Sequence, residues 1–118
     1  MHGRVLIADD DAEVREVLRE VLEESGLEVV EASDGDAALT ALRREPDLRL
    51  VLLDIRMPRL DGAAFLAQRA GDPKLAEVPV VVVSATEPDP AVLRGASGFL
   101  RKPTELGALL EVVGRYCA

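Results

Sequence analysis

The sequence predicts an α/β fold in which five βα units build one doubly wound, five-stranded parallel sheet. Five short runs rich in valine and leucine alternate along the chain with segments of helical periodicity. Several runs are apolar at consecutive positions, as expected for strands that are covered by helices on both faces. The length of 118 residues is typical of a single hydrophobic core. We therefore expect one domain over residues 1–118.

The five strands are predicted from runs of β-branched and leucine residues. In chain order they cover residues 5–8, 27–31, 50–53, 80–83 and, with a weaker signal, 99–100. Because each strand is followed by a helix, the connections are expected to be right-handed crossovers. For a doubly wound sheet of this size the expected strand order is 2-1-3-4-5, which is that of flavodoxin-like three-layer sandwiches.

Two helices follow the first two strands. An apolar stripe predicts the first of them, and Gly26 supplies its end. The stripe consists of Val14, Val17, Leu18, Val21 and Leu22. The second helix is predicted over about residues 36–44, with Ser33 or Asp34 as its N-cap and an end before Pro46.

Three further helices complete the pattern. One follows Asp61 and Gly62. Residues 88–94 contain two prolines and allow only a short helix. The last helix is predicted to start behind Thr104 as its N-cap, and its apolar face consists of Leu106, Leu109, Leu110 and Val113.

The formal net charge of −8 argues against direct binding to nucleic acid or to an anionic membrane, because both require a basic surface. No apolar run approaches the roughly 20 residues that a membrane helix needs, and the first residues lack a signal-peptide pattern. We therefore expect a cytoplasmic protein with protein partners. The single cysteine, Cys117, and the single histidine, His2, exclude an internal disulfide and a Cys/His metal site. We expect Cys117 to pack on the last helix or to be partly exposed, and His2 to be exposed.

Polar side chains follow four of the five predicted strands, at the edge where doubly wound sheets bind their ligands. They are Asp9, Asp10 and Asp11 after the first strand, Asp54 after the third, Ser84 after the fourth and Lys102 after the fifth. Two carboxylates about 4 Å apart repel by roughly 4 kcal/mol at an effective dielectric constant near 20. Lys102 can neutralise part of this charge, and a hard divalent ion can neutralise the rest. Mg²⁺ suits best, because it needs only one or two carboxylates besides water and phosphate oxygens.

Asp54 is the natural nucleophile of this group, because it lies between the acid pair and the side of Ser84 and Lys102. A carboxylate can form an aspartyl phosphate, and a metal, a hydroxyl and an ammonium group can bind the phosphoryl oxygens. Each residue also has a plain structural interpretation. Asp10 or Asp11 could cap the first helix, Asp54 could be a turn residue, Ser84 could bond to backbone and Lys102 could be solvated. Their coincidence at one edge favours a site.

Four segments carry a more specific signal. They are VLIADDD at residues 5–11, LVLLDIRMPRLDG at 50–62, PVVVVSA at 79–85, and Phe99 followed three positions later by Lys102 and Pro103. Together they resemble the receiver domain of bacterial two-component response regulators, and the likeness runs from the first strand to the last helix. The resemblance implies a phosphorelay switch that changes its protein-interaction surface and is not a turnover enzyme. A histidine kinase or phosphotransfer protein presents phosphohistidine, Asp54 accepts the phosphoryl group, and a downstream protein reads the result.

The resemblance also implies a ligand set for Mg²⁺. Asp10 and Asp54 bind the ion directly, Asp9 acts mainly through water, and the backbone carbonyl of Arg56 completes the set. Ser84 and Lys102 hold phosphoryl oxygens.

The likeness further implies that Phe99 turns inward as Ser84 moves toward the phosphate, although Phe99 could also be a plain core aromatic. A cis bond between Lys102 and Pro103 is expected on the same ground, against a general frequency of about 5 to 6%.

The sequence departs from the family pattern in two places, and the first of them falls in the usual signalling face. The interval from Ser84 to Lys102 is a few residues short, and Thr104 replaces an aromatic residue. The main alternative is a pseudo-receiver, which would bind a protein without phosphorylation. A phosphatase with two aspartates two residues apart is disfavoured, because Arg56 occupies the second position. A flavin domain is disfavoured by the acidic loop after the first strand. The chain is either a stand-alone receiver or a piece of a longer regulator.

Overall fold

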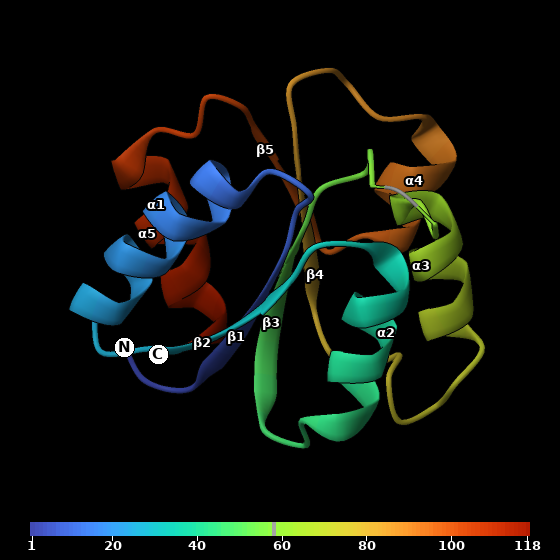
Figure 1. The fold of residues 1–118 in the computed structure, drawn as a ribbon, viewed down its shortest axis with the longest axis horizontal. Helices are drawn as coiled ribbons and strands as arrows, with labels where there is room; N and C mark the ends of the chain where they lie inside the picture. Colours follow the sequence, from blue (N-terminus) through green and yellow to red (C-terminus); the bar gives the residue numbers. More distant parts are fainter. Residues whose placement is uncertain (58) are drawn as a thin grey trace.

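The computed structural model describes residues 1–57 and 59–118, so Pro58 of the predicted loop lies outside the described residues. Five parallel strands form one sheet in the order β2-β1-β3-β4-β5, which confirms the predicted topology (Figure 1). The strands are β1 (Arg4–Ala8), β2 (Glu28–Ala32), β3 (Leu48–Leu53), β4 (Val80–Ser84) and β5 (Gly98–Arg101). Their ends differ from the prediction by one or two residues, because pairing with the neighbouring strand decides where each strand ends.

Helices cover both faces of the sheet and make the predicted three layers (Figure 1). On one face lie α1 (Ala12–Glu24) and α5 (Leu106–Tyr116), and on the other lie α2 (Gly35–Arg44), α3 (Gly62–Ala70) and α4 (Pro90–Gly95). The expectation of a short helix after β4 is confirmed, since α4 has 6 residues. Its first residue is Pro90, where the missing N–H costs no helical hydrogen bond.

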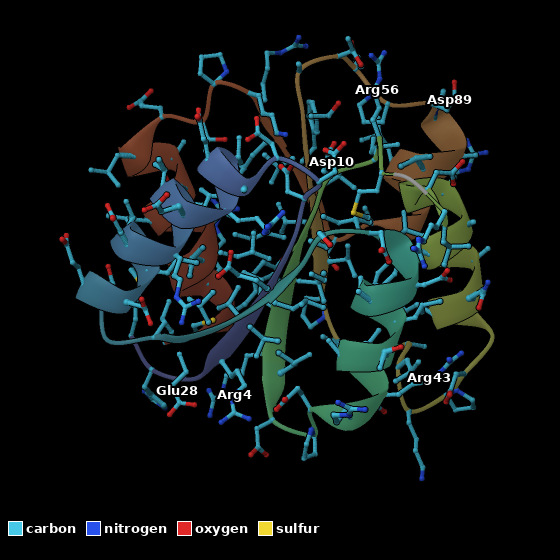
Figure 2. All side chains as sticks on the ribbon, viewed as in Figure 1. Arg4, Asp10, Glu28, Arg43, Arg56 and Asp89 are labelled. Atoms are coloured by element: carbon cyan, nitrogen blue, oxygen red, sulfur yellow. The ribbon has the colours of Figure 1, made fainter. Side chains whose placement is uncertain are left out.

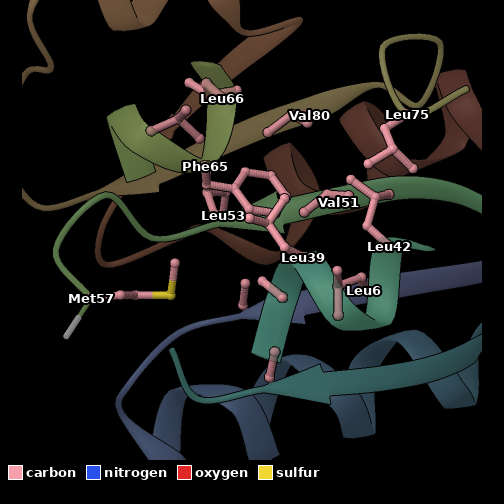
Figure 3. Packing of buried hydrophobic residues seen from close by; sticks show 14 of the residues in the cluster. Leu6, Leu39, Leu42, Val51, Leu53, Met57, Phe65, Leu66, Leu75 and Val80 are labelled. Atoms are coloured by element: carbon pink, nitrogen blue, oxygen red, sulfur yellow. The ribbon is translucent and has the colours of Figure 1, made fainter. Parts of the chain in front are cut away.

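The strands alternate between two hydrophobic cores. In β1, Val5 and Ile7 pack toward α1 and α5, whereas Leu6 and Ala8 pack toward α2, α3 and α4. Phe65 of α3 is fully buried in the second core, over the labelled side chains of β3 (Figure 3). Burying each such side chain stabilises the fold by roughly 1.5 to 3 kcal/mol. The strands that carry the polar residues at their ends are therefore held by a packed core on each face of the sheet.

Aspartates cap the first three helices. Asp11, Asp34 and Asp61 each accept a hydrogen bond from the backbone N–H three residues on, at 3.5, 2.7 and 2.8 Å. The N-cap of α1 is therefore Asp11, which leaves Asp10 free for another role. Likewise the N-cap of α2 is Asp34 and not Ser33.

The N-cap of α5 and the exposure of two apolar residues differ from the prediction. Thr104 is not the N-cap of α5, because the helix begins at Leu106 and its cap residue is Glu105, which makes no side-chain cap bond. Val17 and Leu106 are 60% and 54% exposed and do not belong to the packed faces. Val17 lies at the margin of the stripe, about 100° around the helix from Leu18, and Leu106 lies at the open end of α5.

The two ends of the chain meet beside α5 (Figure 1). The backbone N–H of His2 donates to the carbonyl oxygen of Cys117 at 2.9 Å. Cys117 is fully buried, so of the two expectations for it, packing on the last helix is confirmed and partial exposure is not. His2 is exposed as predicted. Among the described residues, no helix combines the length and the apolar character that crossing a bilayer requires.

Candidate functional site

The carboxyl edge of the sheet gathers the predicted site residues. Ala8 pairs with Leu53, so Asp9 and Asp54 leave neighbouring strands at the same level. Ser84 is the last residue of β4 and pairs with Arg101, directly before Lys102. Figure 2 shows Asp10 and Arg56 together at this end of the molecule.

Three carboxylates lie within reach of one another at this edge. Asp9, Asp10 and Asp54 each offer an oxygen atom, and these atoms all lie within 4.8 Å of one another. Asp9 and Asp54 are 3% and 8% exposed, whereas Asp10 is open to solvent. Because like charges at this distance repel, the cluster needs a cation to hold it in its ionised form.

Lys102 supplies one positive charge to the cluster. Its Nζ donates a hydrogen bond to Asp9 Oδ2 at 2.7 Å and lies 3.6 Å from Asp54 Oδ2. Burial by itself lowers the pKa of Lys102, but the hydrogen bond to Asp9 and the charges of Asp54 and Asp9 outweigh it and raise the pKa above 10.5. The ammonium group therefore stays charged between the two buried carboxylates. The peptide bond from Lys102 to Pro103 is cis, as expected.

Backbone N–H groups hold the two buried carboxylates in place. Asp9 Oδ1 accepts from the N–H of Asp11 at 2.9 Å, and Asp54 Oδ1 accepts from the N–H of Arg56 at 3.2 Å. Asp54 itself is tied to β1, because its N–H donates to the carbonyl oxygen of Ala8 at 2.8 Å. These bonds leave one oxygen of each carboxylate directed to Lys102 and the opening of the site.

The pKa of the Asp54 carboxyl is raised above 3.8 in the folded protein. Burial is the largest cause, and the charges of Asp9 and Asp10 add to it, while the Arg56 N–H and Lys102 act in the opposite direction. The ionised form of Asp54 is thus costly beside these acids. A further cation near Asp9 and Asp10 would lower that cost.

Asp54→Asn is expected to raise the midpoint of thermal unfolding at pH 7, because it removes a buried charge. From pH 3.8 up to the raised pKa, the folded protein holds a proton on Asp54 that the unfolded chain has lost. The stability associated with this proton is present below pH 3.8 and is lost as the pH rises through the raised pKa. Thermal melts in EDTA should therefore show that the midpoint of Asp54→Asn exceeds that of wild type by an amount that grows with pH. A gain that is the same at every pH would contradict this account.

Ser84 and Thr86 complete a small cavity above the acids. Ser84 is 4% exposed, and its Oγ accepts from the N–H of Thr86 at 3.2 Å. The cavity has a volume of about 220 Å³ and is lined by Asp10, Asp54, Arg56, Ser84, Ala85, Thr86 and Lys102. A larger hollow of about 580 Å³ lies at the opposite edge, where Arg4 already pairs with Glu28 (Figure 2). The smaller cavity is therefore the better candidate for the functional site, because it combines carboxylates, hydroxyls and an ammonium group.

Phe99 of β5 is half-buried and packs against the core on the side of α4. The guanidinium carbon of Arg101 lies 5.9 Å from the centre of its ring, which is within the range of a cation–π contact. The predicted switch aromatic thus sits between core and surface. The structure has one position for it and leaves its movement as a prediction.

One arginine near the site escaped prediction from the sequence. It is Arg15 of α1, whose Nη1 donates to the backbone carbonyl of Asp9 at 2.7 Å. Arg15 stands one helical turn after the acid run, which is a weak signal, because most arginines on a surface helix are solvated. The predicted acids, Ser84 and Lys102, by contrast, lie at the expected edge.

Comparisons with known proteins show which family this chain matches. Residues 5–114 match the family described as the response regulator receiver domain. The chain is 34% identical over 122 residues to the phosphate regulon transcriptional regulatory protein PhoB of Escherichia coli, covering 98% of this chain and 53% of PhoB. It is 33% identical over 117 residues to an uncharacterized 14.6 kDa protein of Leptolyngbya boryana, covering 96% of this chain and 88% of that protein.

The fold is also that of solved structures. Chemotaxis protein CheY4 of Vibrio cholerae superposes with a TM-score of 0.86 at 25% identity, covering 98% of this chain and 99% of CheY4. This chain therefore covers 99% of the solved CheY4 chain but only about half the length of PhoB.

Proposed function

This chain belongs to the response regulator receiver domain family, and on that premise we propose that Asp54 accepts a phosphoryl group in a Mg²⁺-dependent phosphorelay reaction. One observation carries the proposal. The oxygens of Asp9, Asp10 and Asp54 lie within 4.8 Å of one another, and Lys102 Nζ bonds to Asp9 beside Asp54. This arrangement has too much negative charge for Lys102 alone and has an open side above Asp54.

The donor set fits a hard divalent ion. Carboxylate and carbonyl oxygens are what Mg²⁺ prefers, and the solvent-open side at Asp10 leaves room for the waters it keeps. Asp10 and Asp54 would hold the ion directly, Asp9 mainly through water, and the carbonyl of Arg56 would complete the protein ligands. Bound there, Mg²⁺ would neutralise charge on the phosphoryl oxygens.

Asp54 acts as the nucleophile of the transfer. A carboxylate oxygen of Asp54 attacks the phosphorus of a phosphohistidine, a new P–O bond forms, and the P–N bond breaks. The leaving imidazole keeps the bonding electron pair and takes up a proton. Lys102 and the Ser84 hydroxyl hold the phosphoryl oxygens as charge develops on them. The domain is its own acceptor and turns over no separate substrate.

Ser84 and Phe99 are the proposed switch residues. The Ser84 Oγ accepts a hydrogen bond from the Thr86 N–H, and the guanidinium group of Arg101 lies over the Phe99 ring. A phosphoryl group on Asp54 offers the Ser84 hydroxyl a charged acceptor for its own hydrogen. As Ser84 turns toward it, Phe99 moves inward and the surface of β5 and its flanking helices changes. The phosphoryl group thereby shifts a population between two conformations.

The proposed partners are proteins on either side of this reaction. A histidine kinase or a phosphotransfer protein supplies the phosphoryl group, and a downstream protein target binds the altered face. We propose that residues 1–118 form one receiver domain, that it acts in the cytoplasm, and that it contacts neither nucleic acid nor membrane directly. PhoB is a transcriptional regulatory protein and extends well beyond the part matched here, so the last point concerns this chain alone.

The test is phosphorylation by a small donor. Wild-type protein incubated with acetyl phosphate and Mg²⁺ should gain one phosphoryl group by intact-mass analysis, and Asp54→Ala should gain none. Asp11→Asn is the matched control, because Asp11 belongs to the same acid run but caps α1 through the Glu13 N–H. It should be phosphorylated like wild type. EDTA should abolish the gain in every variant.

Failure of this experiment has a defined meaning. If wild type gains no phosphoryl group from acetyl phosphate or phosphoramidate with Mg²⁺ present, the pseudo-receiver alternative replaces the proposal. A phosphoryl group that is still gained by Asp54→Ala would place the acceptor elsewhere.

A further inference from the structure

Arg15 ties the turn between β1 and α1 to a neighbouring strand. Its Nη1 donates to the backbone carbonyl of Asp9 at 2.7 Å, and its Nε donates to Glu31 Oε1 of β2 at 3.1 Å. The Arg15 side chain is only 17% exposed, so the guanidinium group bridges the two under partial cover. One planar group thus connects the turn of the acid pair to the sheet.

Asp10 is the member of the acid cluster that depends most on this turn. The carboxylates of Asp9 and Asp54 accept hydrogen bonds from backbone N–H groups and face Lys102. Within residues 1–57 and 59–118, by contrast, no donor bonds the carboxylate of Asp10, so the direction of its side chain is set through its backbone. The carbonyl that Arg15 holds and the N–H of Asp10 belong to the same planar peptide unit.

We propose that Arg15 is a positioning residue for the divalent-cation site. By fixing the peptide plane between Asp9 and Asp10, it keeps the Asp10 carboxylate beside those of Asp9 and Asp54. This inference rests on the proposed metal site and deepens it, because it names a residue outside the ligand set that determines its affinity. Residues that orient metal ligands in this way typically change affinity by about 10-fold to 100-fold when they are replaced.

The charge of Arg15 and its hydrogen bond to the Asp9 carbonyl have opposite effects on the affinity for a divalent ion. A cation this close to the acids repels a divalent ion, although Glu31 offsets part of that charge. Removing the charge and removing the hydrogen bond therefore change the affinity with opposite signs. Lysine separates the two effects, because it keeps the charge while its single ammonium group cannot reproduce the planar fork that reaches both partners.

Arg19 provides a matched control on the same helix. It also pairs with Glu31, at 2.6 Å from Oε2, and with Glu23 at 3.1 Å, but its guanidinium makes no bond to the acid turn among the described residues. Arg15→Lys and Arg19→Lys therefore make the same chemical change and weaken the same carboxylate partner. They differ in the bond to the Asp9 carbonyl.

The experiment measures Mg²⁺ binding by isothermal titration calorimetry at fixed pH and ionic strength. Arg15→Lys should bind Mg²⁺ about 10-fold more weakly than wild type, and Arg19→Lys should bind like wild type. Hydrogen–deuterium exchange without Mg²⁺ is the second measurement, and residues 9–14 should exchange faster in Arg15→Lys than in Arg19→Lys. A purely structural role would lower the unfolding midpoint of both variants and change neither result selectively.

Each other outcome overturns the inference in a distinguishable way. Arg15 would act only through its charge if Arg15→Lys bound Mg²⁺ like wild type and Arg15→Gln bound Mg²⁺ more tightly than wild type. Equal weakening in Arg15→Lys and Arg19→Lys would assign the effect to Glu31. Wild type that takes up no Mg²⁺ would refute the metal site itself and, with it, the role of Arg15. If wild type binds Mg²⁺ and Arg15→Lys binds it equally well, only the role of Arg15 would be refuted.

Discussion

Lys102→Met should lower the free energy of unfolding by about 3 kcal/mol at pH 7 without divalent cations, because it leaves buried charges unpaired. Lys102 Nζ lies 2.7 Å from Asp9 and 3.6 Å from Asp54, whose side chains are 4% and 9% exposed. Methionine has a similar length but no charge, so both carboxylates would face each other and Asp10. Urea unfolding in EDTA measures the difference.

The pH dependence distinguishes this electrostatic cause from lost packing. Lys102 lowers the pKa of Asp54, so its removal raises that pKa further. The deficit of Lys102→Met should therefore shrink as the pH falls and Asp54 takes up a proton. At the alkaline end, the pKa of Lys102 is raised above 10.5, so its contribution is complete below pH 10.5 and is lost as the pH rises past the raised value.

The other lysine of the chain is the control. Lys74 is exposed, and Lys74→Met should change stability by less than about 0.5 kcal/mol. Mg²⁺ should restore more stability to Lys102→Met than to wild type, because the ion no longer competes with an ammonium group. If Lys102→Met were as stable as Lys74→Met at pH 7, the electrostatic role assigned to Lys102 would be wrong.

Gly35→Ala should lower the free energy of unfolding by about 3 kcal/mol, through a backbone clash beneath the site. A Cβ atom at Gly35 would overlap the backbone carbonyl of Leu60 and come within 2.5 Å of its Cβ. Leu60 belongs to the loop between Asp54 and α3, so either the loop or the start of α2 must move. A backbone atom cannot give way as the end of a flexible side chain can. Chemical denaturation measures the loss.

Gly107→Ala is the control for adding one methyl group to a helical glycine. Its Cβ would meet only Glu105 Oε1 at 3.5 Å, which is ordinary contact, and position 107 is exposed in α5. It should be as stable as wild type or slightly more so, because alanine favours helix. Equal stabilities of Gly35→Ala and Gly107→Ala would show that the loop adjusts without cost.

The strands and their order were predictable because a parallel sheet buries both faces of each strand. Consecutive apolar residues in 50–53 and 80–83 predicted β3 and β4, and the crossover rule limited the order. Helix ends were less predictable. Thr104 is not the cap of α5, and the structure selected Asp11 from the two candidate caps of α1, because a cap depends on where the chain enters the helix.

Exposure of apolar residues was a second limit of the sequence. The stripe that predicted α1 included Val17, which is 60% exposed. Helical period gives the direction of a side chain around the helix, but the width of the packed face depends on the neighbouring helix and the sheet. Only the assembled layers decide where that face ends.

The sequence by itself determined which side chains reach the carboxyl edge of the sheet. Residues that follow parallel strands must meet there, so Asp9, Asp54 and Lys102 were predictable from their places after β1, β3 and β5. The tertiary structure alone decided that Lys102 bonds to Asp9 more closely than to Asp54, and that Arg15 holds the turn before Asp10. The reason is that such contacts depend on differences of an ångström between side chains from separate elements. Sequence periodicity determines direction along one element, whereas these distances depend on how the elements are packed together.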